Sequence, residues 1–301
     1  MKVSFVTCDV FTRRPFTGNP LFVVPNASGL TTAQMQALAR EINYSESTFV
    51  IPAKDPRHGY LQRTFVPVKE IPYAGHPTVG TAVVMASLGK IGGENGGDVV
   101  PVTIEVGFGP LKLELEKSDG TVTRVRMEQG RPAWDEPLTS QELLGKIASG
   151  LDVPYDALFG PHPPRVVSTG NRFLMLPIPS LDFLSKAEVD PRILSLVERE
   201  LDVLGIYLFT RTGDESVRAR AFCPSAGVPE DPATGSAAGP LGVYLAVEKA
   251  LPASRRFRID QGIEMGRPSE IDVEVLLDGE RPAGVRVSGS AVVMMRGEID
   301  V

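Results

Sequence analysis

The segment EDPATGSAAG, residues 230–239, decides how this chain is interpreted. An acidic residue and a proline lead through small and hydroxyl-bearing residues into a long apolar segment. A near copy, AGHPTVGTA, stands much earlier, at residues 74–82. Such a pattern is typical of the start of a helix, where unpaired backbone N–H groups and a partial positive charge can hold an anion. The sequence therefore predicts two helix starts of this kind.

The segments around the two motifs repeat in the same order, which indicates an ancient duplication. In each half a Gly-Asn turn leads into an apolar strand, followed by a helix, two further strands and the motif. The matching segments are TGNPLFVV and TGNRFLMLPI, TTAQMQALAREI and DPRILSLVERELD, STFVI and GIYLFT, RTFVP and RAFCP, and IEVGFGPLKLELE and IDQGIEMGRPSEIDVEVLLDG. Pairs that stay in register from end to end predict two similar lobes about a pseudo-two-fold axis.

The balance of strands and helices predicts the α+β class, with a mostly antiparallel sheet and a buried helix in each lobe. The buried helix is expected to start at the motif, because the residues that follow are small and apolar. Pro77 and Pro232 suit its first turn, where a missing N–H costs little. The helix before it is expected to bury one face in each half, formed by Met35, Leu38, Ala39 and Ile42 and by Ile193, Leu196, Val197 and Leu201.

Length and charge bound the class of protein. A chain of 301 residues favours two domains. The net charge of −6 disfavours nucleic acid and anionic membrane as partners, since both need a basic footprint. No apolar run reaches the length of a membrane span, and the N-terminal segment lacks the features of a signal peptide, so we expect a cytoplasmic protein. The two cysteines and three histidines lack paired spacing, and no metal site is expected.

The two copies of the motif differ at an informative position. His76 and Asp231 each stand directly before the proline, and we assign them to corresponding places in the two lobes. An imidazole and a carboxylate that face each other across a cleft are a natural pair for moving protons. The structural alternative, an N-terminal helix cap, is stronger for Asp231 than for His76.

The glycines of the motif allow two interpretations. They either let an anion approach the backbone, or only permit tight packing of a helix against a sheet; the residues concerned are Gly75, Gly80, Gly235 and Gly239. Two copies in register favour the first interpretation. A nucleotide-binding P-loop is disfavoured, because no lysine stands between Gly235 and Ser236.

Several segments together resemble the PhzF-like phenazine-biosynthesis proteins, which share a fold with diaminopimelate epimerase and proline racemase. The resemblance rests on FTGNPLFVV, MQALAREINYSESTFV, YAGHPTVGTA, GVPEDPATGSAAGPLG and QGIEMGRPSEI. It implies two lobes, each a barrel-like sheet around a central helix, with the active site in the cleft between them. The N-terminal lobe would comprise residues 1–128 and 285–301, the C-terminal lobe residues 129–284. A homodimer is implied as well, since many members form one.

The same resemblance implies a site and a reaction. Glu46, in the segment NYSESTFV, matches the family's proton-shuttling glutamate; without the resemblance it would be taken for a surface carboxylate. The matching supporting residues are His76, Asp231 and Ser236, and the matching substrate-binding residues are Gly75, Gly80, Thr234 and Gly235. The implied reaction is a cofactor-free isomerisation of a dihydro-hydroxyanthranilate, in which a proton leaves one ring carbon and returns to another. Carboxylate bases of this kind need partial burial and a nearby group that stabilises the carbanion.

Two other functions stay open at this point. One is an epimerase or racemase that acts on another small amino or hydroxy acid with the same carboxylate; the other is a non-catalytic binding relative. A racemase with two opposed thiols is disfavoured, because Cys8 and Cys223 do not stand at the motifs. Arg63 and Arg220 could contact a substrate carboxylate, but structural ion pairs are favoured. Substrate choice is assigned to loops such as residues 89–101 and 159–166.

Overall fold

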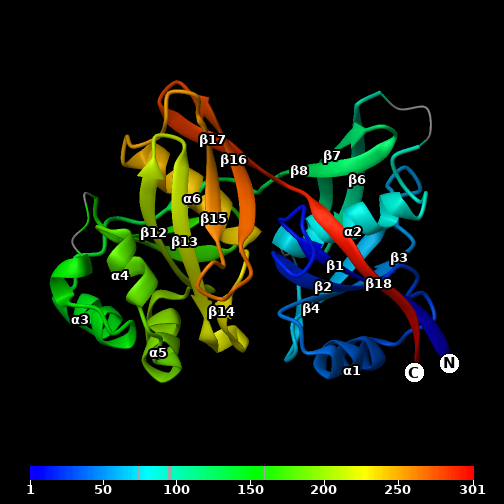
Figure 1. The fold of residues 1–301 in the computed structure, drawn as a ribbon, viewed down its shortest axis with the longest axis horizontal. Coiled ribbons are helices and arrows are strands. Elements are labelled where there is room, and N and C mark those ends of the chain that lie inside the picture. Colours follow the sequence, from blue (N-terminus) through cyan, green and yellow to red (C-terminus); the bar gives the residue numbers. More distant parts are fainter. Residues whose placement is uncertain (73–74, 94–96, 159, 161) are drawn as a thin grey trace. The chain divides into compact units, whose positions relative to one another are not determined.

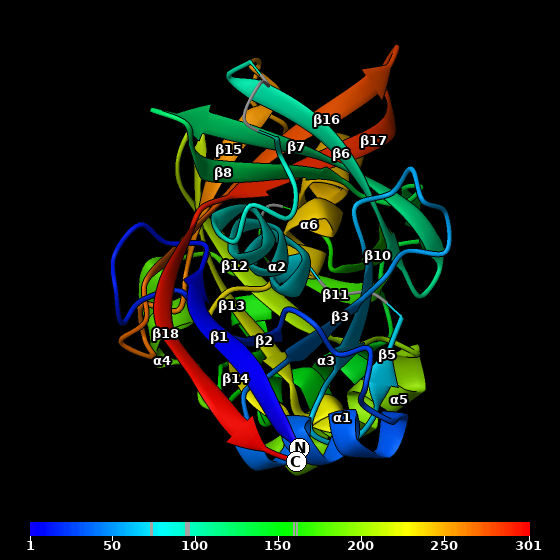
Figure 2. The same cartoon turned by 90° about the vertical axis from the view of Figure 1, so that its right-hand side faces the viewer.

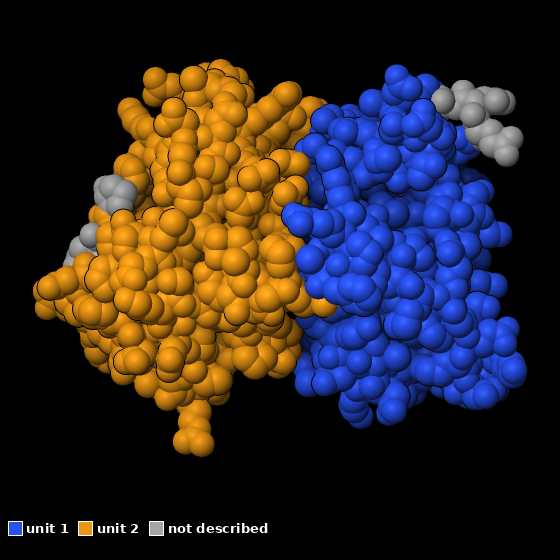
Figure 3. All heavy atoms as spheres, in the orientation of Figure 1, with its two compact units in different colours: residues 1–128, 288–301 blue, residues 129–287 orange. Residues whose placement is uncertain are grey.

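The computed structural model describes residues 1–72, 75–93, 97–158, 160 and 162–301. The loops to which we assigned substrate choice, residues 89–101 and 159–166, therefore lie partly outside the described residues. The chain divides into two compact units, coloured separately in Figure 3. Unit 1 comprises Met1–Glu128 and Ser288–Val301, and unit 2 comprises Gln129–Val287. Within the described residues no helix is long and apolar enough to span a membrane.

Unit 1 is a sheet built around one helix (Figures 1 and 2). Its elements are β1 (Lys2–Val10), β2 (Asn19–Val24), α1 (Thr32–Ile42), β3 (Ser47–Ile51), β4 (Leu61–Phe65), β5 (Glu70–Ile71), α2 (Gly75–Ser87), β6 (Val99–Val106), β7 (Gly109–Ser118), β8 (Thr121–Glu128) and β18 (Ala291–Asp300). The strands pair in the order β18–β1–β2–β3–β4–β6–β7–β8, and β5 pairs with β4. The pairs β2–β3 and β4–β6 are parallel, and the others are antiparallel.

Helix α2 lies at the centre of unit 1. It contacts β1, β2, β3, β8 and β18, and all its residues from Gly75 to Met85 are buried. A helix that carries apolar and small residues on every side suits such a place, since no side of it has to face water. The prediction of a buried helix at the motif is confirmed here.

Unit 2 repeats this plan. Its elements are β9 (Ala133–Trp134), α3 (Gln141–Gly150), the 3₁₀ turn η1 (Tyr155–Leu158), β10 (Arg165–Ser168), β11 (Arg172–Pro177), α4 (Leu181–Lys186), α5 (Pro191–Leu201), β12 (Gly205–Gly213), β13 (Ser216–Cys223), the 3₁₀ turn η2 (Pro224–Ala226), β14 (Val228–Asp231), α6 (Gly235–Val247), β15 (Arg256–Gln261), β16 (Ser269–Asp278) and β17 (Arg281–Gly289). Helix α6 contacts β10, β11 and β16, and most of its residues are buried.

The same order of strand pairing recurs in the two units. In unit 1, β2 pairs in parallel with β3, and β4 pairs antiparallel with β3 and β5 and in parallel with β6. In unit 2, β11 pairs in parallel with β12, and β13 pairs antiparallel with β12 and β14 and in parallel with β15. Each parallel pair β2–β3 and β11–β12 is connected through helical segments, α1 in one unit and α4 and α5 in the other. The predicted α+β class with a mostly antiparallel sheet is thus confirmed.

The helix before the motif was predicted well in one unit and less well in the other. In α1 the residues Met35, Leu38 and Ala39 are buried as expected, and Thr31 forms a capping box with Gln34 at the helix start. In α5 the expected face is confirmed only in part, because Val197 is buried and Ile193 and Leu201 are half-buried, but Leu196 is 57% exposed.

Helix α5 turns a neighbouring face inward. Its buried residues are Leu194, Val197 and Glu198. Leu194 belongs to an apolar cluster of unit 2 to which α3, α5, β11 and β12 contribute residues. The burial of Glu198, a carboxylate, is why the apolar pattern misled the prediction.

Candidate functional site

The candidate site in unit 1 lies where three elements begin. Strands β2 and β3 are parallel, so both start at the same end of the sheet. Asn19, the first residue of β2, therefore lies near Glu46, which directly precedes β3. His76 is in the first turn of α2. The His76 Nδ1 atom lies 2.9 Å from Glu46 Oε2 and 3.2 Å from Asn19 Nδ2. The structure thus brings Glu46 and His76 together, whereas the proton-transferring pair predicted from the sequence was His76 with Asp231.

Burial separates the roles of these two side chains. The His76 side chain is 2% exposed, whereas that of Glu46 is 17% exposed. Asn19 is fully buried, and its Oδ1 accepts a hydrogen bond from Ser45 Oγ at 3.2 Å. Of the three polar groups Glu46 alone keeps access to solvent, so it is the group that a small molecule can reach.

The neighbours of Nδ1 define two protonation patterns. If Nδ1 carries the proton, it donates to a charged Glu46 carboxylate. If Nδ1 is unprotonated, its single lone pair accepts either from the amide N–H of Asn19 or from a protonated Glu46. The two tautomers of His76 can therefore pair Nδ1 with a charged or with a protonated Glu46, as a group that alternates between base and acid requires. The other ring nitrogen, Nε2, is buried with no hydrogen-bond partner among the described residues.

The candidate site in unit 2 centres on Asp231, the last residue of β14. Asp231 is 8% exposed, and its Oδ2 accepts a hydrogen bond of 2.7 Å from Thr234 Oγ1. Thr234 directly precedes α6, but its hydroxyl is directed to Asp231 and does not cap the helix. Ser236, the second residue of α6, is half-buried. Asp231, Thr234, Gly235 and Ser236 thus lie together at the start of α6.

Gln261, the last residue of β15, is hydrogen-bonded to this segment. Its Nε2 donates to the Asp231 carbonyl at 2.7 Å and to Thr234 Oγ1 at 2.9 Å. Its Oε1 accepts from the Thr234 N–H at 3.2 Å and from the Tyr207 hydroxyl at 2.9 Å. Burial, reinforced by the negative charge of Asp231, raises the pKa of Tyr207, so this hydroxyl stays a neutral donor. The amide of Gln261 therefore fixes both ends of the turn from Asp231 to Thr234.

The two copies of the motif begin their helices at different points, which corrects one prediction. Helix α2 starts at Gly75, so Pro77 is in its first turn as expected. Helix α6 starts at Gly235, so Pro232 lies before it, while Pro240 lies inside the helix. Both helices span thirteen residues.

Counting from the helix starts changes the expected correspondence. His76 is the second residue of α2, and the second residue of α6 is Ser236. Asp231 lies four residues ahead of α6, in β14. The assignment of His76 and Asp231 to equivalent places is therefore wrong, because the shared His-Pro and Asp-Pro order does not mark the same point of the backbone.

The motif glycines occupy two kinds of position, the start of a helix and its interior. Gly75 and Gly235 are the first residues of their helices, and the Gly235 carbonyl accepts a hydrogen bond of 2.8 Å from Gln129 Nε2. Gly80 lies in the interior of α2, where an added Cβ would come within 2.6 Å of Leu21 and of Val10. Gly80 was predicted to bind substrate. Its position instead allows α2 to pack closely against the side chains of β1 and β2.

Neither cysteine is placed for acid–base chemistry. Cys8 and Cys223 are both buried as free thiols. Burial, with a smaller contribution from the charge of Asp9, raises the pKa of Cys8 well above its usual range. The described residues hold no group of three or more His, Cys, Asp or Glu side chains that could bind a metal ion.

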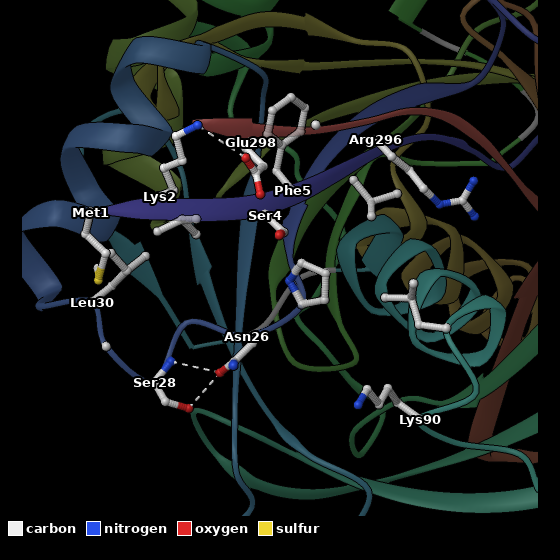
Figure 4. Close-up of a pocket in the computed structure, with 16 residues that line it drawn as sticks. Met1, Lys2, Ser4, Phe5, Asn26, Ser28, Leu30, Lys90, Arg296 and Glu298 are labelled. Carbon is white, nitrogen blue, oxygen red and sulfur yellow. Dashed lines mark hydrogen bonds and ion pairs between the residues drawn. The ribbon is translucent and has the colours of Figure 1, made fainter. Parts of the chain in front are cut away.

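A pocket of about 730 Å³ in unit 1 lies apart from these clusters (Figure 4). Its lining comes mainly from β1, the loop at residues 25–30 and β18, with Phe5 and Leu30 among its apolar residues. Lys2 and Glu298, on its rim, form an exposed ion pair of 3.6 Å. None of the predicted site residues lines it.

Two amides were missed by reasoning from sequence. Asn19 stands in the repeated Gly-Asn turn, which we interpreted only as a turn, and Gln261 stands in the segment QGIEMG, which we used only for its resemblance. Amides carry no acid–base chemistry of their own, so only their position in the fold reveals their function. The repetition of the turn was the one available signal for Asn19.

Comparison with known proteins identifies the family. The model of the phenazine biosynthesis-like proteins, PhzC-PhzF, matches residues 8–297. The chain belongs to this family. It is 37% identical to a trans-2,3-dihydro-3-hydroxyanthranilate isomerase of Pseudomonas fluorescens, with 98% of this chain and 99% of the relative covered. It is 34% identical to an uncharacterized isomerase of Clostridium acetobutylicum, with 99% and 98% covered.

Solved structures agree with the membership in the PhzC-PhzF family. A PhzF-family phenazine biosynthesis protein of Bacillus anthracis matches with a TM-score of 0.87 and 26% identity over the whole of both chains. A predicted epimerase of Pseudomonas aeruginosa matches with a TM-score of 0.84 and 32% identity over 99% of both chains. A probable proline racemase, 13% identical with a TM-score of 0.69, shares the fold. The named isomerases among the relatives show that this member is an isomerase.

Proposed function

We propose that this protein is a cofactor-independent isomerase that moves a proton between two carbons of a small carboxylate-bearing substrate, with Glu46 as the general acid and base. The observation that carries the proposal is the contact of 2.9 Å between Glu46 and the buried His76 at the start of α2. A carboxylate that keeps partial access to solvent, beside an imidazole that can donate or accept a proton, has what proton transfer at carbon requires.

The proposed reaction needs no external reagent. The Glu46 carboxylate removes a proton from one carbon, and the electron pair of the broken C–H bond spreads into the substrate as an enolate-like anion. The same carboxylic acid returns the proton to a second carbon, so substrate and product have the same atoms. The partial positive charge at the start of α2 favours negative charge there, and so stabilises the transition state more than the substrate, in which the enolate charge has not yet developed.

We assign Asp231, Ser236 and Thr234 of unit 2 to the same substrate, together with the backbone at Gly75 and Gly235. The hydrogen bond from Thr234 to Asp231 Oδ2 holds these two side chains together at the start of α6. The predicted cleft between the lobes is part of this proposal, as are the homodimer and the cytoplasmic location.

The relatives support a particular substrate. Three of them, from species of Pseudomonas, carry the name trans-2,3-dihydro-3-hydroxyanthranilate isomerase and are 35% to 37% identical to this chain. We therefore propose trans-2,3-dihydro-3-hydroxyanthranilate, or a close cyclic amino acid, as the substrate. Its carboxylate is the anion that a helix start would bind.

An epimerase is the second candidate, and the structure named as a predicted epimerase, at 32% identity, favours it. Glu46 would then remove the proton from one face of the carbon, and a second acid such as Asp231 would deliver a proton to the opposite face of the same carbon. A two-thiol racemase has no support, because both thiols are buried.

Proton exchange separates these functions. The wild-type protein is incubated in D₂O with trans-2,3-dihydro-3-hydroxyanthranilate and with a panel of small amino, hydroxy and unsaturated acids, and deuterium is followed by NMR. The proposal expects uptake at a carbon other than the one that lost its proton, with a rearranged double bond. Uptake at a single carbon with inversion would make the protein an epimerase. Absence of uptake from every compound would contradict both.

A further inference from the structure

An arginine–glutamate pair holds the hairpin that carries Asp231. Arg220 on β13 donates from Nε to Glu230 Oε1 at 2.8 Å and from Nη2 to Glu230 Oε2 at 2.9 Å. The remaining nitrogen, Nη1, donates to the carbonyls of Leu184 and Ala187 at 3.0 and 2.7 Å. Two nitrogens thus donate to the carboxylate, and the third donates to carbonyls at the C-terminal end of α4. These hydrogen bonds fix the guanidinium in one orientation.

The pair of Arg220 and Glu230 is largely buried. The Arg220 side chain is 8% exposed and that of Glu230 is 19% exposed. The guanidinium also lies over the ring of Phe222, 5.0 Å from its centre. An arginine enclosed on all these sides is part of the framework, as the preference for a structural pair over a substrate contact predicted.

Unit 1 repeats the pair at the equivalent hairpin. Arg63 on β4 donates from Nε to Glu70 Oε1 at 2.8 Å and from Nη2 to Glu70 Oε2 at 2.6 Å, and lies 5.3 Å from the centre of the Phe65 ring. The same nitrogens, the same oxygens and the same aromatic position recur. Each unit therefore contains the same arginine–glutamate pair, which we call the clamp. Its arginine lies on the strand before the motif, β4 in unit 1 and β13 in unit 2.

In unit 2 the clamp acts on the residue next to Asp231. Strand β14 pairs with β13 so that Asp231 is opposite Ala221, and the register shifts between Ala221 and Cys223. Because side chains alternate along a strand, Glu230 and Asp231 point to opposite faces. A bulged strand of four residues has little pairing of its own to resist a slip. Fixing Glu230 on one face therefore sets where the carboxylate of Asp231 lies on the other.

We propose that Arg220 and Glu230 are positioning residues that set the carboxylate of Asp231 for the reaction. The inference rests on the proposed function, which places Asp231 against the substrate. The planar fork of arginine is essential to it, because the ammonium of lysine cannot bind both oxygens of Glu230 and the two carbonyls of Leu184 and Ala187 together. Arg220→Lys keeps the charge and removes the geometry.

The kinetic test compares Arg220→Lys and Glu230→Gln with Arg256→Lys. Arg256 forms a cross-strand pair with Glu274, 2.7 Å between Nη2 and Oε1, and is remote from the motif in sequence and exposed. We expect kcat to fall about 10- to 100-fold in the first two variants, with little change in KM and none in the control. In an Asp231→Asn background the same substitutions should lower kcat no further, because they act through Asp231. A fall that multiplies with Asp231→Asn would overturn the proposal.

A second measurement needs no substrate. With ¹³C in the side-chain carboxyl groups of aspartate, the Asp231 resonance is assigned by its loss in Asp231→Asn. We expect Arg220→Lys to shift that resonance at constant pH, and Arg256→Lys to leave it in place. An unmoved resonance in a folded Arg220→Lys variant would overturn the positioning. If the wild type turns over no compound, the proposed function fails, and the resonance still decides the inference.

Discussion

The imidazole of His76 connects the polar groups of the unit 1 cluster. One ring nitrogen faces Glu46 and Asn19, and the rest of the ring is enclosed by the fold. A buried imidazole cannot turn to find new partners, so its orientation is set before any substrate arrives. Because the imidazole is already oriented, the proton transfer does not include the free-energy cost of turning the ring.

Glu198 is a second buried carboxylate, and it makes stability depend on pH. Its Oε2 accepts from the Ser225 N–H at 2.8 Å, while Oε1 has no partner among the described residues. Burial raises the pKa of Glu198 from 4.5 to about 7, against smaller opposing contributions from Ser225 and Arg199. The folded state then holds a proton that the unfolded state releases between these values, so stability falls as the pH rises from 4.5 to 7.

We predict that Glu198→Gln removes this dependence. The free energy of unfolding of the variant should match that of the wild type near pH 4.5 and exceed it by on the order of 2–3 kcal/mol at pH 8. Urea unfolding at both pH values measures the difference. Glu200→Gln, an exposed carboxylate on the same helix, should show no such change with pH. Equal effects of the two substitutions would contradict the account.

Among the elements, α2 shows how closely the helix and the sheet of unit 1 approach each other. Gly80 faces β1 and β2, and an added methyl group would meet Leu21 and Val10 at 2.6 Å. Distances this short force neighbouring side chains to move. The approach of the helix therefore depends on the absence of a side chain at this position.

We predict that Gly80→Ala destabilises the protein by about 1–2 kcal/mol, because overpacking outweighs the better helix propensity of alanine. Thermal and urea unfolding measure the change. Gly145→Ala in α3 is the matched control, since an added Cβ there meets nothing within 4 Å and should not destabilise. An unchanged or raised stability in Gly80→Ala would show that α2 can shift away from the strands.

The elements also show what the sequence could predict. Repeated segments predicted two similar lobes, because the same order of turns and apolar runs dictates the same pairing twice. The face of α5 was predicted only in part, because one of its buried side chains is the carboxylate of Glu198, which an apolar pattern does not include. Glu46 was found only by resemblance, since a carboxylate before a strand has no local signal. Asn19 and Gln261 required the fold itself.

For the whole molecule, the return of the chain end to unit 1 is the main structural fact. Strand β18 pairs with β1 along its full length, from Lys2 opposite Asp300 to Val10 opposite Ala291. Figure 2 shows the two strands side by side. Since β1 also contacts α2, the last residues of the chain complete the sheet around the helix of the first unit.

Deletion of residues 291–301 is therefore expected to unfold unit 1 while unit 2 stays folded. Hydrogen exchange read by mass spectrometry should show lost protection of peptides from α2 and retained protection of peptides from α6. Deletion of Val301 alone serves as the control and should leave both protected. Full protection of α2 in the longer deletion would show that β18 is dispensable.

The most direct test of the central claim compares Glu46→Gln with Glu41→Gln, an exposed carboxylate at the end of α1. Both variants and the wild type are incubated in D₂O with trans-2,3-dihydro-3-hydroxyanthranilate, and deuterium incorporation is followed by NMR. The account predicts exchange in the wild type and in Glu41→Gln, and a loss of about 10²- to 10⁴-fold or more in Glu46→Gln. Exchange at the wild-type rate in a folded Glu46→Gln variant would show that another group moves the proton.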